Sequence, residues 1–434
     1  MSIGLRAFLL SSSDSGHLKA HPDGAIVWNE SGQITFVGNW NDRPSDEQIR
    51  WEDQNGKLVT PGFIDVHCHL PQYPVVACGG QELLPWLKKF VFPCERAFSP
   101  KKAKIEAPLF FSELKRYGIT AAAVYTTVDA KSTQVCFRAA QASRLRVAMG
   151  QMMMDVDSYA PKPHKNLTQS VLNESAKLCD QWHRTSSGRL TYAFSPRFAL
   201  TCSATLLREC AKLAKEAGAF IQTHLAENRA ELVAVKSLFP SSKDYTHVYE
   251  RFGLLGPRTV MGHAIYLSAR EYHALAATET KVAHCPSSNL FLRSGVMAYD
   301  RMRENRITVG LASDVAAGPE LNPWEVMKAA SYGQNLRSCY VKNAKTCSPA
   351  ELFHLATISG AAVLEKQTEI GQLRRGFMAD CALWDTKDLL PYRSKLPHNP
   401  SELVSLLIYR GARLEATKVW VAGEVVWPEA EAGV

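Results

Sequence analysis

Eight short apolar stretches alternate with helix-like segments in the middle of this 434-residue chain, and this alternation constrains the fold more than any other feature. The intervening segments, such as residues 203–218, repeat apolar residues at helical spacing and end in glycine. The stretches are LVTPGFIDVHCH, GITAAAVYTT, RLRVAMGQMMMD, LTYAFSPR, AFIQTH, TVMGH, KVAH and ITVGLASD. Eight strand and helix units are typical of a (β/α)8 TIM barrel, an α/β fold, and we predict this barrel for residues 58–365.

The two ends of the chain have a different pattern. Residues 1–57 and 366–434 alternate apolar and polar residues between turn signals, as antiparallel strands do. We expect both ends to meet in one small β-sandwich domain. The proline-rich residues 388–403 are expected to form a long irregular loop within it.

Composition narrows the possible partners and location. The chain is 46% hydrophobic, and none of its apolar runs approaches the ~20 residues that a membrane span requires. Its net charge of +8 is spread along the sequence, so we expect neither a membrane nor a nucleic-acid partner. Eleven cysteines without a CxxC pair favour reduced thiols, and we expect a cytoplasmic protein.

Most of the apolar stretches end at His, Arg or Asp. Because the active site of such a barrel lies at the carboxyl ends of its strands, these side chains are expected to gather at the barrel mouth. His67 and His69 alternate on a strand and therefore point to the same side, whereas Cys68 between them points away. His224 and Asp314 end two further stretches, which would bring a third imidazole and a carboxylate to the same place.

Three imidazoles and a carboxylate form a donor set that suits zinc and leaves room for a water molecule. Zinc would lower the pKa of that water to ~7. Other interpretations stay open, because a histidine pair can make ordinary polar contacts and Asp314 could cap a helix.

Two further polar residues follow strands of the predicted barrel. Glu227, three residues after His224, could carry a proton from the water to a substrate, although an acid there could also cap a helix. His263 could orient the water or stabilise developing charge, or only support a ligand. We expect His284 to be structural or to support a metal ligand. The aromatic residues Trp86, Phe90 and Phe92 are at a spacing more typical of helix core than of a substrate site.

The motifs PGFIDVHCH, THLAEN, GHAIYLS and ASDVAAG together resemble the amidohydrolase superfamily, whose members share the barrel and the small β domain. Longer segments resemble the guanine deaminases within it: HLPQY, LLPWLKKFVFPCERAF, SPRFALTCS, HLAENRAEL and AHCPSSNL.

This resemblance implies a role for particular residues. The positions that match zinc ligands are His67, His69, His224 and Asp314. The positions that match purine contacts are Gln72, Arg197 and Phe198. Glu227 and His263 match the proton shuttle and the water-orienting histidine, with Asp314 taking the proton of the water.

The implied reaction is the deamination of guanine to xanthine and ammonia by zinc-bound hydroxide. The resemblance implies one Zn²⁺ per subunit, a small purine base as substrate, and a homodimer. A binuclear amidohydrolase usually bridges its metals with a lysine after the fourth strand, and residues 190–198 contain none. The other zinc deaminase fold needs a PCxxC pair, which PCERA lacks. The alternatives are a related enzyme acting on 8-oxoguanine, cytosine or a triazine, and a non-catalytic scaffold of the same fold.

Overall fold

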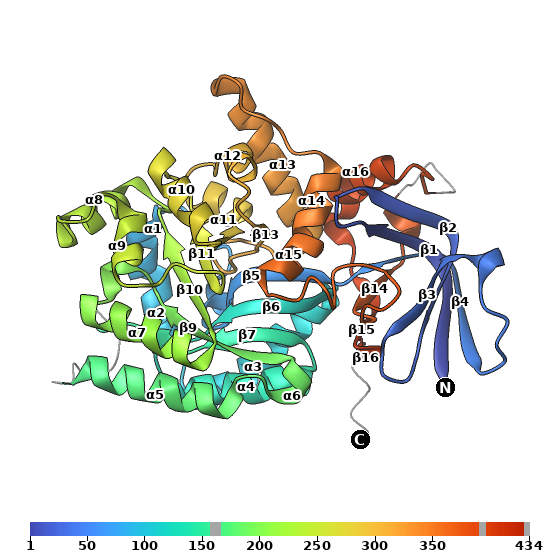
Figure 1. Ribbon diagram of the computed structural model, residues 1–434, viewed down its shortest axis with the longest axis horizontal. Coiled ribbons are helices and arrows are strands. Elements are labelled where there is room, and N and C mark those ends of the chain that lie inside the picture. Colours follow the sequence, from blue (N-terminus) through green and yellow to red (C-terminus); the bar gives the residue numbers. More distant parts are fainter. Residues whose placement is uncertain (157–165, 390–395, 429–434) are drawn as a thin grey trace.

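The computed structural model describes residues 1–156, 166–389 and 396–428, and it contains a barrel with a smaller β domain beside it (Figure 1). Neighbouring strands of the barrel sheet are parallel, and the sheet order follows the chain. Its strands are β5 (Phe63–His69), β6 (Ile119–Tyr125), β7 (Arg146–Gly150), β9 (Leu190–Pro196), β10 (Phe220–Leu225), β11 (Thr259–His263), β12 (Lys281–His284) and β13 (Val309–Leu311), and the short β8 (Met152–Met153) pairs with β9. All eight predicted stretches contain one of these strands.

The sheet closes on itself through the segment that follows β13. The backbone N–H of Asp314 donates to the carbonyl of His67 at 2.9 Å, and the N–H of His69 donates to the carbonyl of Val315 at 2.9 Å. These bonds join the first and last barrel strands, so the predicted barrel is confirmed.

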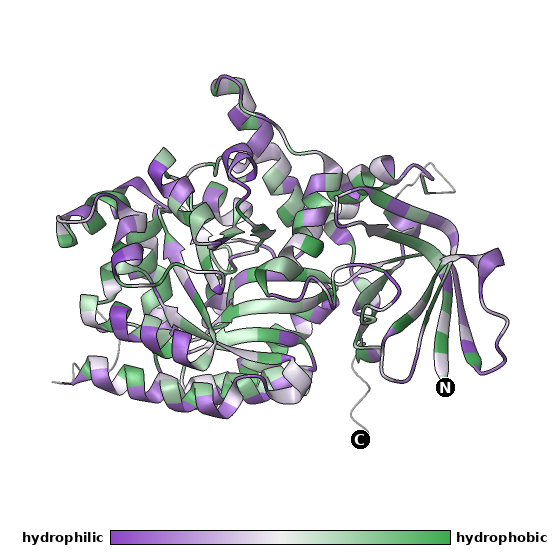
Figure 2. Ribbon diagram, in the orientation of Figure 1, coloured by the Kyte–Doolittle hydropathy of each residue, from purple (hydrophilic) through white to green (hydrophobic). Residues whose placement is uncertain are grey.

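Helices surround the strands, and Figure 2 shows mainly hydrophobic strands β6 and β7 beside helices of mixed hydropathy. The predicted helix at residues 203–218 is α7 (Ala204–Ala217), which begins where Ser203 accepts a hydrogen bond from the N–H of Leu206 and ends at Gly218 with a φ of 60°. The other helices of the barrel region are α3 (Pro100–Arg116), α4 (Ala130–Ser143), α5 (Leu167–Trp182), α6 (Thr185–Gly188), α8 (Arg229–Leu238), α9 (Tyr245–Arg251), α10 (Ala269–Ala277), α11 (Pro286–Phe291), α12 (Tyr299–Glu304), α13 (Pro323–Tyr340), α14 (Pro349–Ala356) and α15 (Ile358–Val363). Among the described residues, no helix is both long and apolar enough to cross a bilayer.

Both chain ends build the second sheet, as expected. Its order is β16-β15-β14-β4-β1-β2-β3, so the two ends meet where β14 pairs with β4. The strands are β1 (Ser2–Ser12), β2 (Leu18–Trp28), β3 (Ile34–Asn39), β4 (Ile49–Pro61), β14 (Cys381–Trp384), β15 (Ala416–Val421) and β16 (Glu424–Trp427).

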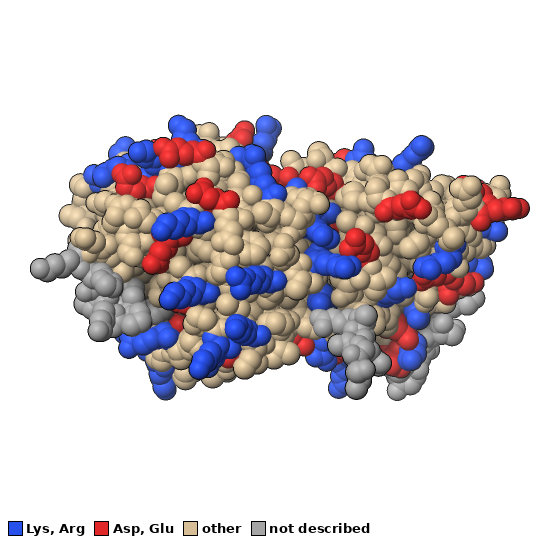
Figure 3. All heavy atoms as spheres, turned by 90° about the horizontal axis from the view of Figure 1, so that it is seen from below, with Lys and Arg blue, Asp and Glu red and all other residues tan. Residues whose placement is uncertain are grey.

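On the face that Figure 3 shows, Lys and Arg side chains are interspersed with Asp and Glu.

Two details differ from the sequence-based expectations. Strand β4 runs through the expected boundary at residues 57 and 58, because residues 58–61 pair with β14 rather than with the barrel. Helix α16 (Pro400–Arg410) begins inside the expected loop at 388–403, where Asn399 caps its first turn. It packs against α13 and α14, whereas residues 390–395 of that loop lie outside the described residues.

A buried ion pair links the barrel to the second sheet. Arg146, at the start of β7, donates from Nε to Asp380 Oδ2 at 2.7 Å and from Nη2 to Oδ1 at 3.2 Å. Asp380 Oδ1 also accepts from the N–H of Ala422 at 2.8 Å. Both side chains are buried, and the other acid near Arg146 is the more exposed Glu369, whose Oε2 lies 3.8 Å from Nη1. Losing Asp380 would therefore leave the buried guanidinium poorly compensated.

We therefore expect Asp380→Ala to lower the free energy of unfolding by about 3–5 kcal/mol, the usual cost of breaking a buried pair. Chemical denaturation of the purified protein measures this loss. The control is Glu424→Ala, which removes an exposed pair between Arg144 and Glu424 with an N–O distance of 3.1 Å and should cost at most about 1 kcal/mol. An equal loss of unfolding free energy in the two variants would contradict a stabilising role for the buried Arg146–Asp380 pair.

Candidate active site

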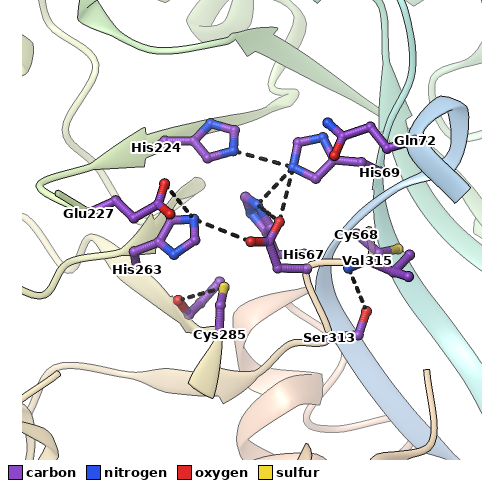
Figure 4. Close-up of polar contacts among 12 residues, drawn as sticks. His67, Cys68, His69, Gln72, His224, Glu227, His263, Cys285, Ser313 and Val315 are labelled. Atoms are coloured by element: carbon purple, nitrogen blue, oxygen red, sulfur yellow. Dashed lines mark hydrogen bonds and ion pairs between the residues drawn. The ribbon is translucent and has the colours of Figure 1, made fainter. Parts of the chain in front are cut away.

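Three histidines converge at the carboxyl ends of the barrel strands (Figure 4). The Nε2 atoms of His67 and His69 are 3.2 Å apart, and those of His69 and His224 are 3.3 Å apart. Asp314 Oδ1 lies 3.3 Å from His67 Nε2 and 3.2 Å from His69 Nε2. One donor atom from each of the four residues lies within 4.8 Å of the others, so together they could hold one metal ion.

The protonation of these histidines favours metal binding. Burial lowers the pKa of His69 to about 4, and it lowers the pKa of His67 and of His224 as well, so the imidazoles are neutral at pH 7. His224 Nδ1 donates to the carbonyl of Arg197 at 2.6 Å, which leaves the lone pair of Nε2 facing the cluster. Neutral imidazoles aimed at one point beside a carboxylate are a donor set that fits zinc.

Asp65 connects the strand that carries His67 and His69 to the segment that carries Asp314. Its Oδ1 accepts from the backbone N–H of His67 and of Ser313, each at 3.1 Å, and its Oδ2 accepts from the Ser313 hydroxyl at 2.5 Å. Burial raises the pKa of Asp65 to about 7, although these hydrogen bonds oppose the shift. Asp65 thus ties β5 to the residue before Asp314. Nothing in the sequence analysis pointed to it.

Glu227 and His263 lie beside the donor set. His263 Nε2 is 3.4 Å from Glu227 Oε2 and 3.6 Å from Asp314 Oδ2, while His263 Nδ1 bonds to Asn289 Oδ1 at 2.8 Å. Burial and the nearby Asp314 raise the pKa of Glu227 well above its usual value. A raised pKa favours the protonated carboxyl, which is the form that can give a proton to a bound molecule.

A second polar group lies across the cavity. Arg197, one residue after β9, donates from Nη1 to Glu95 Oε2 at 2.5 Å, and Gln72 Nε2 donates to Glu95 Oε1 at 2.8 Å. Glu95 is buried in α2 (Phe92–Arg96) and joins the two predicted substrate contacts. The sequence analysis did not name Glu95, although it lies in the quoted segment FVFPCERAF. Residue type alone does not separate a buried acid from a surface acid.

The space between these groups is small. The cavity has a volume of about 30 Å³, which is room for a few water molecules at most. Its roof is Leu83 and Trp86 of α1 (Leu83–Trp86) and Leu87 of η3 (Leu87–Val91). Trp86, which the sequence favoured as helix core, lines the cavity.

The predicted site residues come together. The cavity lining includes His69, Gln72, Arg197, Phe198, His224, Glu227, His263 and Asp314, and His67 lies directly beneath. Cys68 points away as expected, with its Sγ 3.4 Å from the carbonyl oxygen of Ala123. A larger cavity of about 750 Å³ lies beside α14 and α15, but none of the predicted site residues lines it.

Comparison with known proteins agrees with this geometry. The sequence model of the amidohydrolase family matches residues 58–426. The chain belongs to the amidohydrolase family. It is 34% identical over 362 residues to the guanine deaminase of Escherichia coli, covering 82% of this chain and 80% of the relative. It is 30% identical over 434 residues to the guanine deaminase of Mus musculus, covering 98% and 93% of the two chains.

A solved structure gives the same result. The guanine deaminase from C. acetobutylicum, with guanine bound in its active site, superimposes with a TM-score of 0.90 at 26% identity. The match covers 98% of this chain and 100% of the solved chain. The fold and the family membership predicted from the sequence are confirmed. The roles of individual site residues stay predictions.

We expect His67→Ala to abolish metal retention, because it removes one of the convergent nitrogens from the donor set. Metal analysis after dialysis measures the retained zinc. The matched control is His284→Ala, since His284 is also a buried imidazole at a strand end but does not belong to the donor set. Zinc retained by the first variant, or lost equally by both, would contradict the assignment of the site.

Proposed function

We propose that this chain catalyses the hydrolytic deamination of guanine to xanthine and ammonia. The observation that carries the proposal is that a zinc-type donor set, a buried glutamic acid with a raised pKa and an arginine–glutamine pair lie around one cavity. The two relatives and the solved structure named above support guanine as the substrate, because each carries that activity in its name.

One zinc ion per chain would be held by His67, His69, His224 and Asp314. Bound there, zinc acts as a Lewis acid and lowers the pKa of its water to about 7. Lysine is absent from the described residues that line the cavity, and Arg197 stands after β9, where a binuclear amidohydrolase usually carries its bridging lysine.

The side chains around the donor set would move the protons. Asp314 accepts a proton from the attacking water, whose oxygen bonds to C2 of guanine. Glu227 gives its proton to N3, so that the ring nitrogen takes up the electron pair displaced from C2. His263 orients the water through Nε2, which faces both Glu227 and Asp314. The proton taken from the water then passes to the amine at C2. The C2 oxygen returns its remaining proton to Glu227 and becomes a carbonyl as the C2–N bond breaks, and ammonia leaves.

The other side of the cavity would hold the base. Gln72 and Arg197 present an amide and a guanidinium that can pair with the polar edge of guanine, while Phe198 offers an apolar surface. A base without the matching groups would leave buried donors unpaired, which disfavours it strongly. The same geometry could accept 8-oxoguanine, cytosine or a triazine, and these remain the alternative substrates. A non-catalytic scaffold would have no need of the complete donor set.

We infer that the protein is a cytoplasmic homodimer that takes part in purine breakdown. All eleven cysteines are unpaired, which suits a reducing compartment.

Helix α13 protrudes from the body in Figure 1 and carries three exposed apolar residues at four-residue spacing. These residues are Tyr332, Leu336 and Tyr340, whose exposed fractions are 55%, 51% and 83%. Such an exposed apolar stripe can pack against its own copy across a twofold axis. The molar mass in solution, compared with that of Leu336→Asp, tests the dimer.

The substrate is tested by ammonia release from zinc-loaded protein given guanine, 8-oxoguanine, cytosine, adenine and a triazine. We expect chelator-sensitive conversion of guanine to xanthine. We also expect Arg197→Ala to keep its zinc and to raise KM for guanine, because a contact with the base is lost. If the protein preferred another ring, guanine would be refuted as the substrate, but the hydrolytic deamination would stand. If zinc-loaded protein released no ammonia from any of these compounds, the non-catalytic scaffold would be favoured.

Glu95 is expected to act as a positioning residue for Arg197 and Gln72. Glu95→Gln preserves the volume of the side chain but removes the charge that pairs with Arg197, so KM for guanine should rise more than kcat falls. Steady-state kinetics at fixed zinc content measure this split. The control is Glu113→Gln on α3, where the acid pairs with Arg116 at 3.3 Å near the surface and KM should not change. A fall confined to kcat would contradict a role in base positioning.

A further inference from the structure

Cys285 lies directly after β12, close to His263 (Figure 4). It is fully buried and unpaired. One donor atom from each of His67, His263, Cys285 and Asp314 lies within 4.8 Å of the others, so these residues form a second group that could hold a metal ion. This group shares His67 and Asp314 with the donor set described above.

The two oxygens of Asp314 face different groups. Oδ1 lies 3.3 Å from His67 Nε2 and 3.2 Å from His69 Nε2, whereas Oδ2 lies 3.6 Å from His263 Nε2. One carboxylate can therefore bridge two cations, as in two-metal sites whose ions are about 3.5–4 Å apart. With His67 bound to the first ion, the second would be held by Cys285, His263 and Asp314 Oδ2.

An unsatisfied nitrogen also points to a ligand here. His263 is 1% exposed, and its Nε2 makes no hydrogen bond within the part of the chain that the structure describes. Cys285 Sγ has only a long contact of 3.5 Å with the carbonyl oxygen of Ala283. A thiolate, an imidazole and a carboxylate are donors that soft divalent cations prefer.

We propose that a second divalent cation, zinc in excess or cadmium, binds between Cys285 and His263 and inhibits the enzyme. The Cys285 thiol loses its proton to solvent when the cation binds. The ion occupies His263 Nε2, which would otherwise orient the attacking water, and its positive charge opposes protonation of Glu227. The inhibitory part of this inference rests on the proposed deamination, whereas the binding part does not.

The test is a titration of protein that already holds one equivalent of zinc. Cadmium is added, bound cadmium and retained zinc are measured by equilibrium dialysis, and the sulfur-to-cadmium charge-transfer band is followed in the ultraviolet. We expect the wild-type chain to keep its zinc, bind an additional equivalent of cadmium and develop the band. Cys285→Ser should lose the band and bind the additional ion at least about tenfold more weakly, since even partners outside the ligand shell cost 10–100-fold in affinity.

The matched control is Cys68→Ser, because Cys68 is equally buried and lies between two predicted ligands but belongs to neither group. It should keep both the band and the additional equivalent. Cys285→Ala, with its fold checked by circular dichroism, replaces the serine variant if that variant does not fold. A wild-type chain without the band, cadmium that only exchanges with the zinc, or a band that persists without Cys285 would each overturn the proposal.

Inhibition is measured separately as the ratio of activities with and without excess zinc, so that differences in basal turnover cancel. We expect strong inhibition of the wild type and of Cys68→Ser, and at least about tenfold weaker apparent inhibition of Cys285→Ser. The charge-transfer band reports cadmium binding without any substrate. Absence of deamination would therefore refute the proposed function but would leave the test of the second metal site unaffected. A band without inhibition would overturn the inhibitory role.

Discussion

The closure of the barrel between β5 and the segment after β13 is the constraint on which the site depends. His67 and His69 come from the first barrel strand, and Asp314 from the loop after the last. Backbone hydrogen bonds across this seam and the buried Asp65 fix their separation. If this seam opened, the carboxylate would leave the imidazoles, and three buried nitrogen lone pairs would face one another without a counter-charge. Stability at the seam and metal affinity are therefore coupled.

Some residues at these strand ends have a strained backbone. Ala226, His263 and Asp314 have φ values of 50°, 68° and 49°, a region that residues with a side chain rarely adopt. Such conformations cost of order 1–3 kcal/mol each and persist only where the surroundings enforce them. Here the strained residues either carry a predicted site side chain or directly precede Glu227.

Much of the fold and of the donor set follows from the sequence for simple physical reasons. A strand alternates its side chains, so His67 and His69 must share a face, and a parallel barrel brings all its carboxyl ends to one mouth. These rules need only local pattern and topology. Asp65 and Glu95 could not be found in this way, because their importance comes from burial and from partners far away along the chain. The start of α16 was also missed, since its capping residue Asn399 lies within a proline-rich segment that favoured a loop.

The roof of the cavity and Glu95, which holds the predicted base contacts, belong to one continuous segment of the chain. Trp86 closes the cavity from α1, and its Nε1 donates to the carbonyl of Cys78 at 2.6 Å. Glu95, nine residues later in the sequence, holds Arg197 and Gln72. If the roof moved to admit a ring, its movement would disturb the segment that carries Glu95. A base that pairs with Arg197 and Gln72 would restore the same contacts as the roof closes, so that selection of the substrate and exclusion of water become one event.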